Sequence, residues 1–76
     1  MNKTRRKKLT KIKDLLSDEC ENIEILYEEE YEYLENMPEN LQSSERYEQA
    51  ENAVNSLEEA MTLINNAMDC LEEAIG

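Results

Sequence analysis

Residues 47–75 read YEQAENAVNSLEEAMTLINNAMDCLEEAI, and this stretch decides the fold because its apolar residues fall at alternating steps of three and four. Those positions are Tyr47, Ala50, Val54, Leu57, Met61, Ile64, Met68, Leu71 and Ile75. Strict alternation over about four repeats is typical of a coiled-coil seam, where one face of a helix packs against another helix. The stretch therefore predicts one long helix that needs a helical partner.

A second apolar row lies beside this seam. It consists of one alanine every seven residues: Ala53, Ala60, Ala67 and Ala74. One partner helix needs only the seam, whereas both rows together make the apolar face wide enough for two partner helices. We therefore predict an oligomer interface formed by the alanines together with Leu57, Met61, Ile64, Met68 and Leu71. The alternative interpretation is that alanine merely favours helix formation.

The segment before this stretch also has helical spacing. Its apolar residues fall at steps of three and four, in a pattern that repeats every eleven residues: Leu9, Ile12, Leu16, Cys20, Ile23, Tyr27, Tyr31 and Leu34. Nothing from Thr4 to Glu35 should break a helix. The break is expected at Pro38, which suits a first helical turn, with Asn36 as the cap of a short turn over residues 38–42. Ser43 or Ser44 would then cap the second long helix.

These elements predict an all-α fold. One domain, residues 1–76, would contain a helix over about 4–35, a bend over 36–44 and a helix over about 44–75, arranged as an antiparallel, coiled-coil-like hairpin. A core of this size is marginal alone, so we expect the hairpin to pair with a second copy as a homodimer, in a four-helix bundle.

The predicted register follows from a bend centred near residue 40. Lys8 would then face Glu72, and Lys11 would face Asp69. The same register places the two cysteines, Cys20 and Cys70, about 15 Å apart along the helix axis, which is too far for a disulfide. We therefore expect two free and mostly packed thiols.

Charge is divided unevenly along the chain. Seven of the eight cations lie between Lys3 and Lys13, whereas residues 14–76 hold all 19 acids and one cation, Arg46. Seven of the acids recur every three or four residues on the side of the first helix opposite its apolar stripe. This acidic ladder is Asp14, Asp18, Glu21, Glu24, Glu28, Glu32 and Glu35.

The acidic ladder has two interpretations. It spans roughly 30 Å of helix, and a rigid row of carboxylates would imitate duplex phosphates and occupy a basic nucleic-acid groove. The alternative is a solvated helix face. A face built for stability would alternate glutamate with lysine, but Glu24, Glu28 and Glu32 repel one another with no cation between them. This pattern favours a binding role.

Four tyrosines lie near the bend. Three of them fall on the apolar stripes and are interpreted as core residues: Tyr27, Tyr31 and Tyr47. Tyr33 lies off the stripe, and tyrosine is enriched at protein interfaces. It would form an acidic-aromatic patch with Glu29, Glu30, Glu32 and Met37.

The stretch NMPENLQSSERYE, residues 36–48, followed by LEEA repeats, resembles a group of small acidic accessory proteins of bacteriophages and prophages. The resemblance covers the bend and the second helix, and the first helix only in its acidic character. It implies a phage accessory protein that binds and blocks host machinery, such as a defence nuclease. The group supplies no established catalytic or ligand residues to transfer.

Several function classes are disfavoured. The chain has no histidine, which removes a common general base and zinc ligand, and no glycine-rich phosphate loop, so we expect no enzyme, cofactor or metal. The charged N-terminus lacks the apolar segment of a signal peptide, and no stretch has the ~20 apolar residues of a membrane span. We therefore expect no membrane binding and a cytoplasmic location, which the resemblance to phage proteins implies is that of a bacterial host.

The leading expectation is a binding protein that inhibits a basic host protein. Its predicted contacts are Glu24, Glu28, Glu32, Glu35 and Tyr33. One alternative is an oligomeric coiled-coil adaptor whose charge serves only solubility. A third is a nucleotide or nucleic-acid binder, and its contacts would be confined to the basic head: Lys3, Arg5, Arg6, Lys7 and Lys8.

Overall fold

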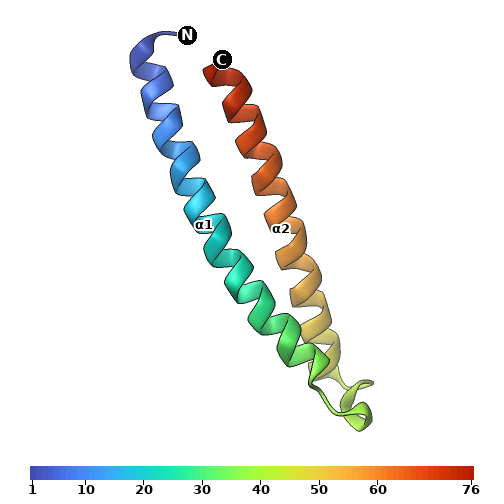
Figure 1. Cartoon of the computed structure of the whole chain (residues 1–76). Coiled ribbons are helices and arrows are strands. Elements are labelled where there is room, and N and C mark those ends of the chain that lie inside the picture. Colours follow the sequence, from blue (N-terminus) through green and yellow to red (C-terminus); the bar gives the residue numbers. More distant parts are fainter.

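The structure is a computed structural model that describes all 76 residues, and it is a helical hairpin. Helix α1 spans Lys3–Glu35, a short 3-10 helix η1 spans Glu39–Leu41, and helix α2 spans Glu45–Ile75. The two long helices run antiparallel, and both chain termini lie at the same end (Figure 1). The molecule measures 59 by 15 by 13 Å. The predicted all-helical hairpin is confirmed.

Side-chain caps set the starts of both long helices. The Asn2 side chain accepts a hydrogen bond from the backbone N–H of Arg5 at 2.8 Å. The hydroxyl of Ser44 accepts one from the backbone N–H of Tyr47 at 3.2 Å, so of the two predicted serines it is Ser44 that caps α2. Such caps satisfy donors that have no partner within the helix.

The prediction that Asn36 caps the short turn is wrong. Its backbone N–H donates to the carbonyl of Glu32 at 3.0 Å, so Asn36 ends α1 instead. Its φ and ψ of −89° and 2° are not the extended geometry of an N-cap. Pro38 precedes η1, and no side chain caps that helix.

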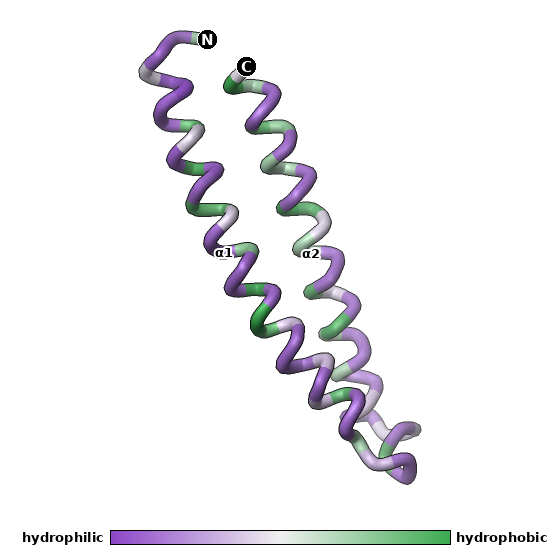
Figure 2. The backbone as a smooth tube through the Cα atoms, in the orientation of Figure 1, coloured by the Kyte–Doolittle hydropathy of each residue, from purple (hydrophilic) through white to green (hydrophobic).

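The buried core is small and lies toward the bend. Four residues are buried: Leu34, Met37, Ala50 and Val54. Tyr27 and Tyr47 are partly buried against this cluster. Elsewhere the residues of the seam are only half-buried, and Figure 2 shows hydrophobic positions recurring along both helices as far as the termini. The hairpin thus covers its own apolar surface incompletely.

The predicted register is wrong by about one helical turn. Facing residues have numbers that sum to about 85 rather than 80, because Lys13 Nζ lies 3.3 Å from Glu72 Oε2 and Ser17, Cys20, Met68 and Asn65 line one hollow. Lys8 therefore does not face Glu72, and Lys11 does not face Asp69.

The path of the bend explains this shift. Met37 is buried and lines the same hollow as Leu41 and Arg46. The bend therefore lies beside the first turn of α2 rather than beyond its end. At the other end of the hairpin, the register leaves residues 3–8 of α1 with no facing residue on α2.

Candidate functional site

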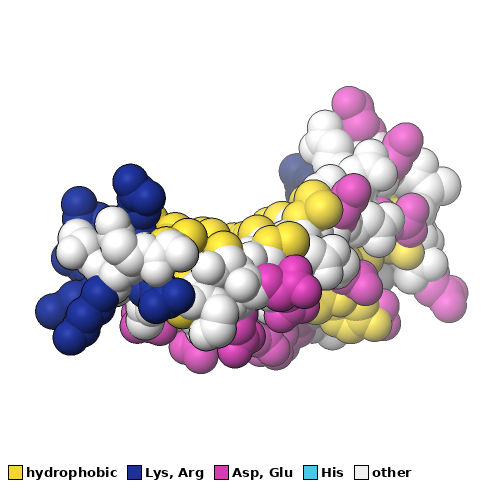
Figure 3. Space-filling model, turned by 90° about the horizontal axis from the view of Figure 1, so that it is seen from above, with side chains coloured by type: hydrophobic (Ala, Val, Ile, Leu, Met, Phe, Trp, Pro, Cys, Tyr) yellow, Lys and Arg dark blue, Asp and Glu magenta, His cyan; other side chains and the backbone are white.

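The acidic ladder is exposed and unneutralised. All seven of its carboxylates are exposed on α1. The hairpin contains a single ion pair, Lys13 with Glu72, and neither residue belongs to the ladder. Acidic side chains gather along one side of the molecule in Figure 3. The ladder therefore carries a continuous negative field with no counter-charge from its own chain.

An isoleucine interrupts the acidic side of α1. Ile25 is 55% exposed, and helical spacing places it next to Glu21, Glu28 and Glu29. Sequence reasoning missed this residue because it lies off the apolar stripe. Its position was nevertheless a usable signal. An apolar residue outside the stripe cannot pack in the core, and this suggests a contact surface.

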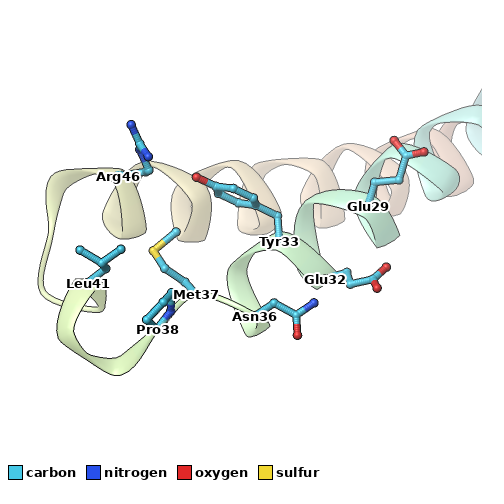
Figure 4. A pocket seen from close by; sticks show the side chains of 8 residues that line it. All are labelled: Glu29, Glu32, Tyr33, Asn36, Met37, Pro38, Leu41 and Arg46. Atoms are coloured by element: carbon cyan, nitrogen blue, oxygen red, sulfur yellow. The ribbon is translucent and has the colours of Figure 1, made fainter.

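A hollow of about 530 Å³ lies at the bend. Its lining residues are Glu29, Glu32, Tyr33, Asn36, Met37, Pro38, Leu41 and Arg46 (Figure 4). The predicted patch around Tyr33 is thus partly assembled, with Met37 as a buried wall and the Tyr33 ring 46% exposed. Sequence reasoning missed Arg46, because its distance from Tyr33 along the chain hides their proximity.

The five predicted contact residues do not form one site. Tyr33 and Glu32 line the bend hollow, but Glu24, Glu28 and Glu35 do not. A neighbouring hollow joins Tyr33 to Glu30, Arg46 and the first alanine of the row. Tyr33 follows Glu28 by five residues, or about 140° around the helix. The ladder and the tyrosine therefore face different directions.

The tyrosine pair near the bend has an altered environment. The rings of Tyr27 and Tyr31 lie 6.0 Å apart and are tilted by 32°. Partial burial raises the pKa of Tyr27, and the carboxylate of Glu58 and the neighbouring Tyr31 raise it further. Tyr27 and Tyr47 pack on the core as predicted, but Tyr31 is 45% exposed. The core assignment of Tyr31 is therefore wrong.

The predicted oligomer residues divide into two groups. The five seam residues, Leu57, Met61, Ile64, Met68 and Leu71, are half-buried within the hairpin, and Met61 and Met68 line a hollow with Cys20 of α1. Of the alanine row, Ala53 and Ala60 are half-buried, whereas Ala67 and Ala74 are exposed. The seam thus serves the hairpin itself, and the alanine row lies at its open side.

The alanines belong to a longer row without charge. It recurs at steps of three and four as Gln49, Ala53, Ser56, Ala60, Leu63, Ala67, Cys70 and Ala74. Gln49 and Ala53 share a hollow with Tyr33 of α1, so this side of α2 adjoins the side of α1 that carries Tyr33. By helical spacing that side also carries Ile12, Leu15 and Leu26. We use the name alanine face for this row on α2 together with the row on α1 that carries Ile12, Leu15, Leu26 and Tyr33.

The alanine face is substantially apolar and open. Leu63 is 59% exposed, and Ile12, Leu15 and Leu26 are 47%, 55% and 56% exposed. A band of hydrophobic side chains runs along one edge of the molecule in Figure 3. Helical spacing places the ladder on the other sides of α1, so the hairpin has one apolar and one acidic surface.

Both cysteines are free, as predicted. Cys20 is half-buried between the helices, but Cys70 is exposed on the alanine face. The expectation of two packed thiols is therefore wrong for Cys70. Its position in the row with Leu63 points it away from α1.

Comparison with known proteins adds no relative. No family model, curated protein or solved structure matches the chain. Neither long helix is apolar enough over a sufficient length to cross a membrane. Interpretation of function therefore depends on the charge, exposure and geometry of the hairpin.

Proposed function

We propose that this chain is a non-enzymatic, self-associating accessory protein that binds and inhibits a basic protein of a bacterial host. The acidic ladder would occupy a basic groove and displace nucleic acid from it. The host context comes from the resemblance of the bend and the second helix to phage accessory proteins. The physical part of the proposal comes from the two surfaces of the hairpin.

The exposed ladder is the observation that carries this proposal. A helix that needed its acids only for solvation would gain stability from intervening cations, yet Glu24, Glu28 and Glu32 have none within the hairpin. Ile25 adds an apolar contact within the same surface, 55% exposed. A basic protein groove with an apolar floor would match both features, and charge complementarity would speed their encounter.

Self-association is supported by incomplete burial. Only four of the 76 residues are buried in the lone hairpin, whereas small domains need a large buried fraction to be stable. A second hairpin on the alanine face would bury Leu63, Leu15 and Leu26 and complete a four-helix bundle. Except for Glu32, which lines the bend hollow, the acidic ladder would stay outside that bundle.

A charge-reversal experiment tests the ladder. Tagged protein is immobilised and exposed to bacterial lysate, and the test variant carries Glu24→Lys, Glu28→Lys and Glu32→Lys. The matched control reverses three exposed acids on α2 and therefore has the same net charge: Glu48→Lys, Glu59→Lys and Glu73→Lys. We expect wild type and control to retain the same basic protein and the ladder variant to lose it.

A second readout tests inhibition. At about 0.1 M salt the captured protein should bind duplex DNA more weakly when the hairpin is added, and raising salt to about 1 M should release the hairpin from the captured protein as charges become screened. Retention of the partner by the ladder variant would show that the ladder is not the site.

The alanine face favours a second candidate, an oligomeric adaptor. Such a protein would bind its partner through apolar contacts, so high salt would not release the partner. The unpaired cations of the basic head favour a third candidate, direct binding of nucleic acid. Deleting residues 1–8 would remove that activity but would leave inhibition through the ladder intact.

A further inference from the structure

The two ends of the hairpin carry opposite charge. Around the termini, residues 1–13 and 69–76 contain seven cations and three acids. Around the bend, residues 28–48 contain eight acids and one cation. In Figure 3 the basic side chains cluster at one end of the molecule. The hairpin is therefore polar along its length.

The cations at the terminal end have almost no partners in their own chain. Lys13 is the only one in an ion pair, and the register leaves residues 3–8 without a facing residue on α2. Arg5 and Lys8 precede Ile12 at steps of three and four, so they extend the α1 row of the alanine face. The alanine face thus ends in free positive charge.

The other end of the alanine face adjoins the acidic residues of the bend. The hollow that contains Ala53 shares Tyr33 and Arg46 with the bend hollow. The bend hollow is also lined by Glu29 and Glu32, whose carboxylates point away from the side chains of Tyr33 and Leu41 in Figure 4. A largely apolar strip, interrupted on α1 by the exposed Glu19 and Asn22, thus connects a basic end to an acidic, aromatic end.

We propose that the alanine face is covered by a second copy of this chain running in the opposite direction, so that the basic head of each copy lies in the bend hollow of the other. This inference rests on the self-association in the proposed function and adds its orientation. Two copies can stack face to face with two-fold symmetry in two ways. Pointing the same way, they would bring the two basic ends together and the two acidic bends together. Pointing in opposite ways, they pair unlike ends twice.

The dimensions of the hairpin suit this arrangement. The helices overlap over residues 9–35 and 50–76, whose midpoints are Asn22 and Leu63. A two-fold axis near these residues stacks α1 of one copy antiparallel on α1 of the other. Lys8 and Arg5 then lie against the bend of the other copy, near residues 36–39. The lengths of 59 and 15 Å give the face a footprint on the scale of the ~800 Å² that each partner buries in a standard interface.

The receiving hollow also suits cations. Glu29 and Glu32 supply two carboxylates against the single guanidinium of Arg46, and the half-exposed ring of Tyr33 supplies a π face for an arginine or lysine. Direct ion pairs there would remove the excess charge at both ends.

A distance measurement tests the orientation. One spin label is placed at an exposed bend position, Ser43→Cys, with Cys20→Ser and Cys70→Ser removing the native thiols. Pulsed dipolar spectroscopy on the dimer should give a distance close to the 59 Å length of the molecule. A distance on the order of 20 Å, about two helix diameters, would mean that the copies point the same way and would overturn the proposal.

Solution mass separates this failure from failure of the proposed self-association. A cooperatively folded single chain at micromolar concentration, with no dipolar coupling, would contradict the proposed self-association. A dimer with the short distance would contradict only its proposed orientation. Neither result decides the ladder experiment, because that experiment reads capture of a basic protein. Since Glu32 belongs to both surfaces, the solution mass of the ladder variant is measured as well.

Charge reversal provides a second test. Arg5→Glu with Lys8→Glu should weaken the dimer at least ~10-fold at low salt, because both head-to-bend contacts become repulsive. The matched pair Lys3→Glu and Lys7→Glu has the same charge but lies on the other side of α1, and it should weaken the dimer less than ~3-fold. Tighter association of the Arg5 and Lys8 variant would indicate copies that point the same way.

A rescue variant closes this test. Adding Glu29→Lys and Glu32→Lys to the Arg5 and Lys8 variant makes each reversed head meet a reversed bend. Affinity should return to within ~3-fold of wild type, because unlike charges again meet at both ends. A combination that binds more weakly than either reversal alone would contradict the proposed pairing.

Discussion

Replacing Leu63 by alanine should separate association from folding. Leu63 is 59% exposed in the lone hairpin, so its truncation removes little packing within one chain. Alanine also has the higher helix propensity. The free energy of unfolding of the single hairpin should therefore change by less than about 0.5 kcal/mol.

The effect on the dimer should be much larger. Full burial of a leucine side chain is worth about 1.5–3 kcal/mol. Association would cover the exposed 59% of the Leu63 side chain. Truncation to alanine then loses about 1–1.5 kcal/mol of binding free energy per copy. Both copies contribute, so the dimer should lose about 2–3 kcal/mol and its Kd should rise roughly 30- to 150-fold.

Ile25 provides a matched control. It is 55% exposed but lies on the acidic surface, so Ile25→Ala removes a similar side chain from the opposite region of the hairpin. Sedimentation equilibrium over a range of concentrations gives both Kd values. If the two variants have equal Kd values, or if Leu63→Ala associates like wild type, the alanine face is not the interface.

Three further predictions concern the single hairpin. Ser44→Ala should lower the free energy of unfolding by about 1 kcal/mol, whereas Ser43→Ala should leave it unchanged; urea unfolding of both variants compares the two serines. A double-mutant cycle on Lys13 and Glu72 should give a coupling of about 0.2–1 kcal/mol, because Lys13 is half-buried and Glu72 is exposed, and a larger coupling between Lys8 and Glu72 would contradict the register. Partial burial raises the pKa of Tyr27 above its ordinary value of 10.0, so the folded state favours the neutral phenol. The neutral phenol therefore contributes to the free energy of unfolding below pH 10, and this stabilisation is lost as pH rises through the raised pKa. The midpoint temperature of thermal unfolding, measured from pH 8 to pH 11, should therefore fall more steeply with pH for wild type than for Tyr27→Phe.

Local chemistry was sufficient to predict the helices. The uninterrupted run from Thr4 to Glu35 and the heptad seam that begins at Tyr47 gave element bounds that agree with the structure to within one residue at each end. Pro38 placed the bend correctly, and Ser44 was one of two predicted caps. These features depend on spacing and on backbone hydrogen bonding within a few residues, which the amino-acid order specifies directly.

The relation between the two helices was beyond local chemistry. Burial of Met37 draws the bend alongside α2, and this shift moves the partner of Glu72 from Lys8 to Lys13. It also leaves the basic head without a facing helix and joins Tyr33 to Arg46. Periodicity constrains which side of a helix is apolar but not how far one helix slides along another, because a slide of one turn keeps the same residues at the seam. Packing at the bend removes that freedom, and so it was tertiary contact that set the two ends of the alanine face.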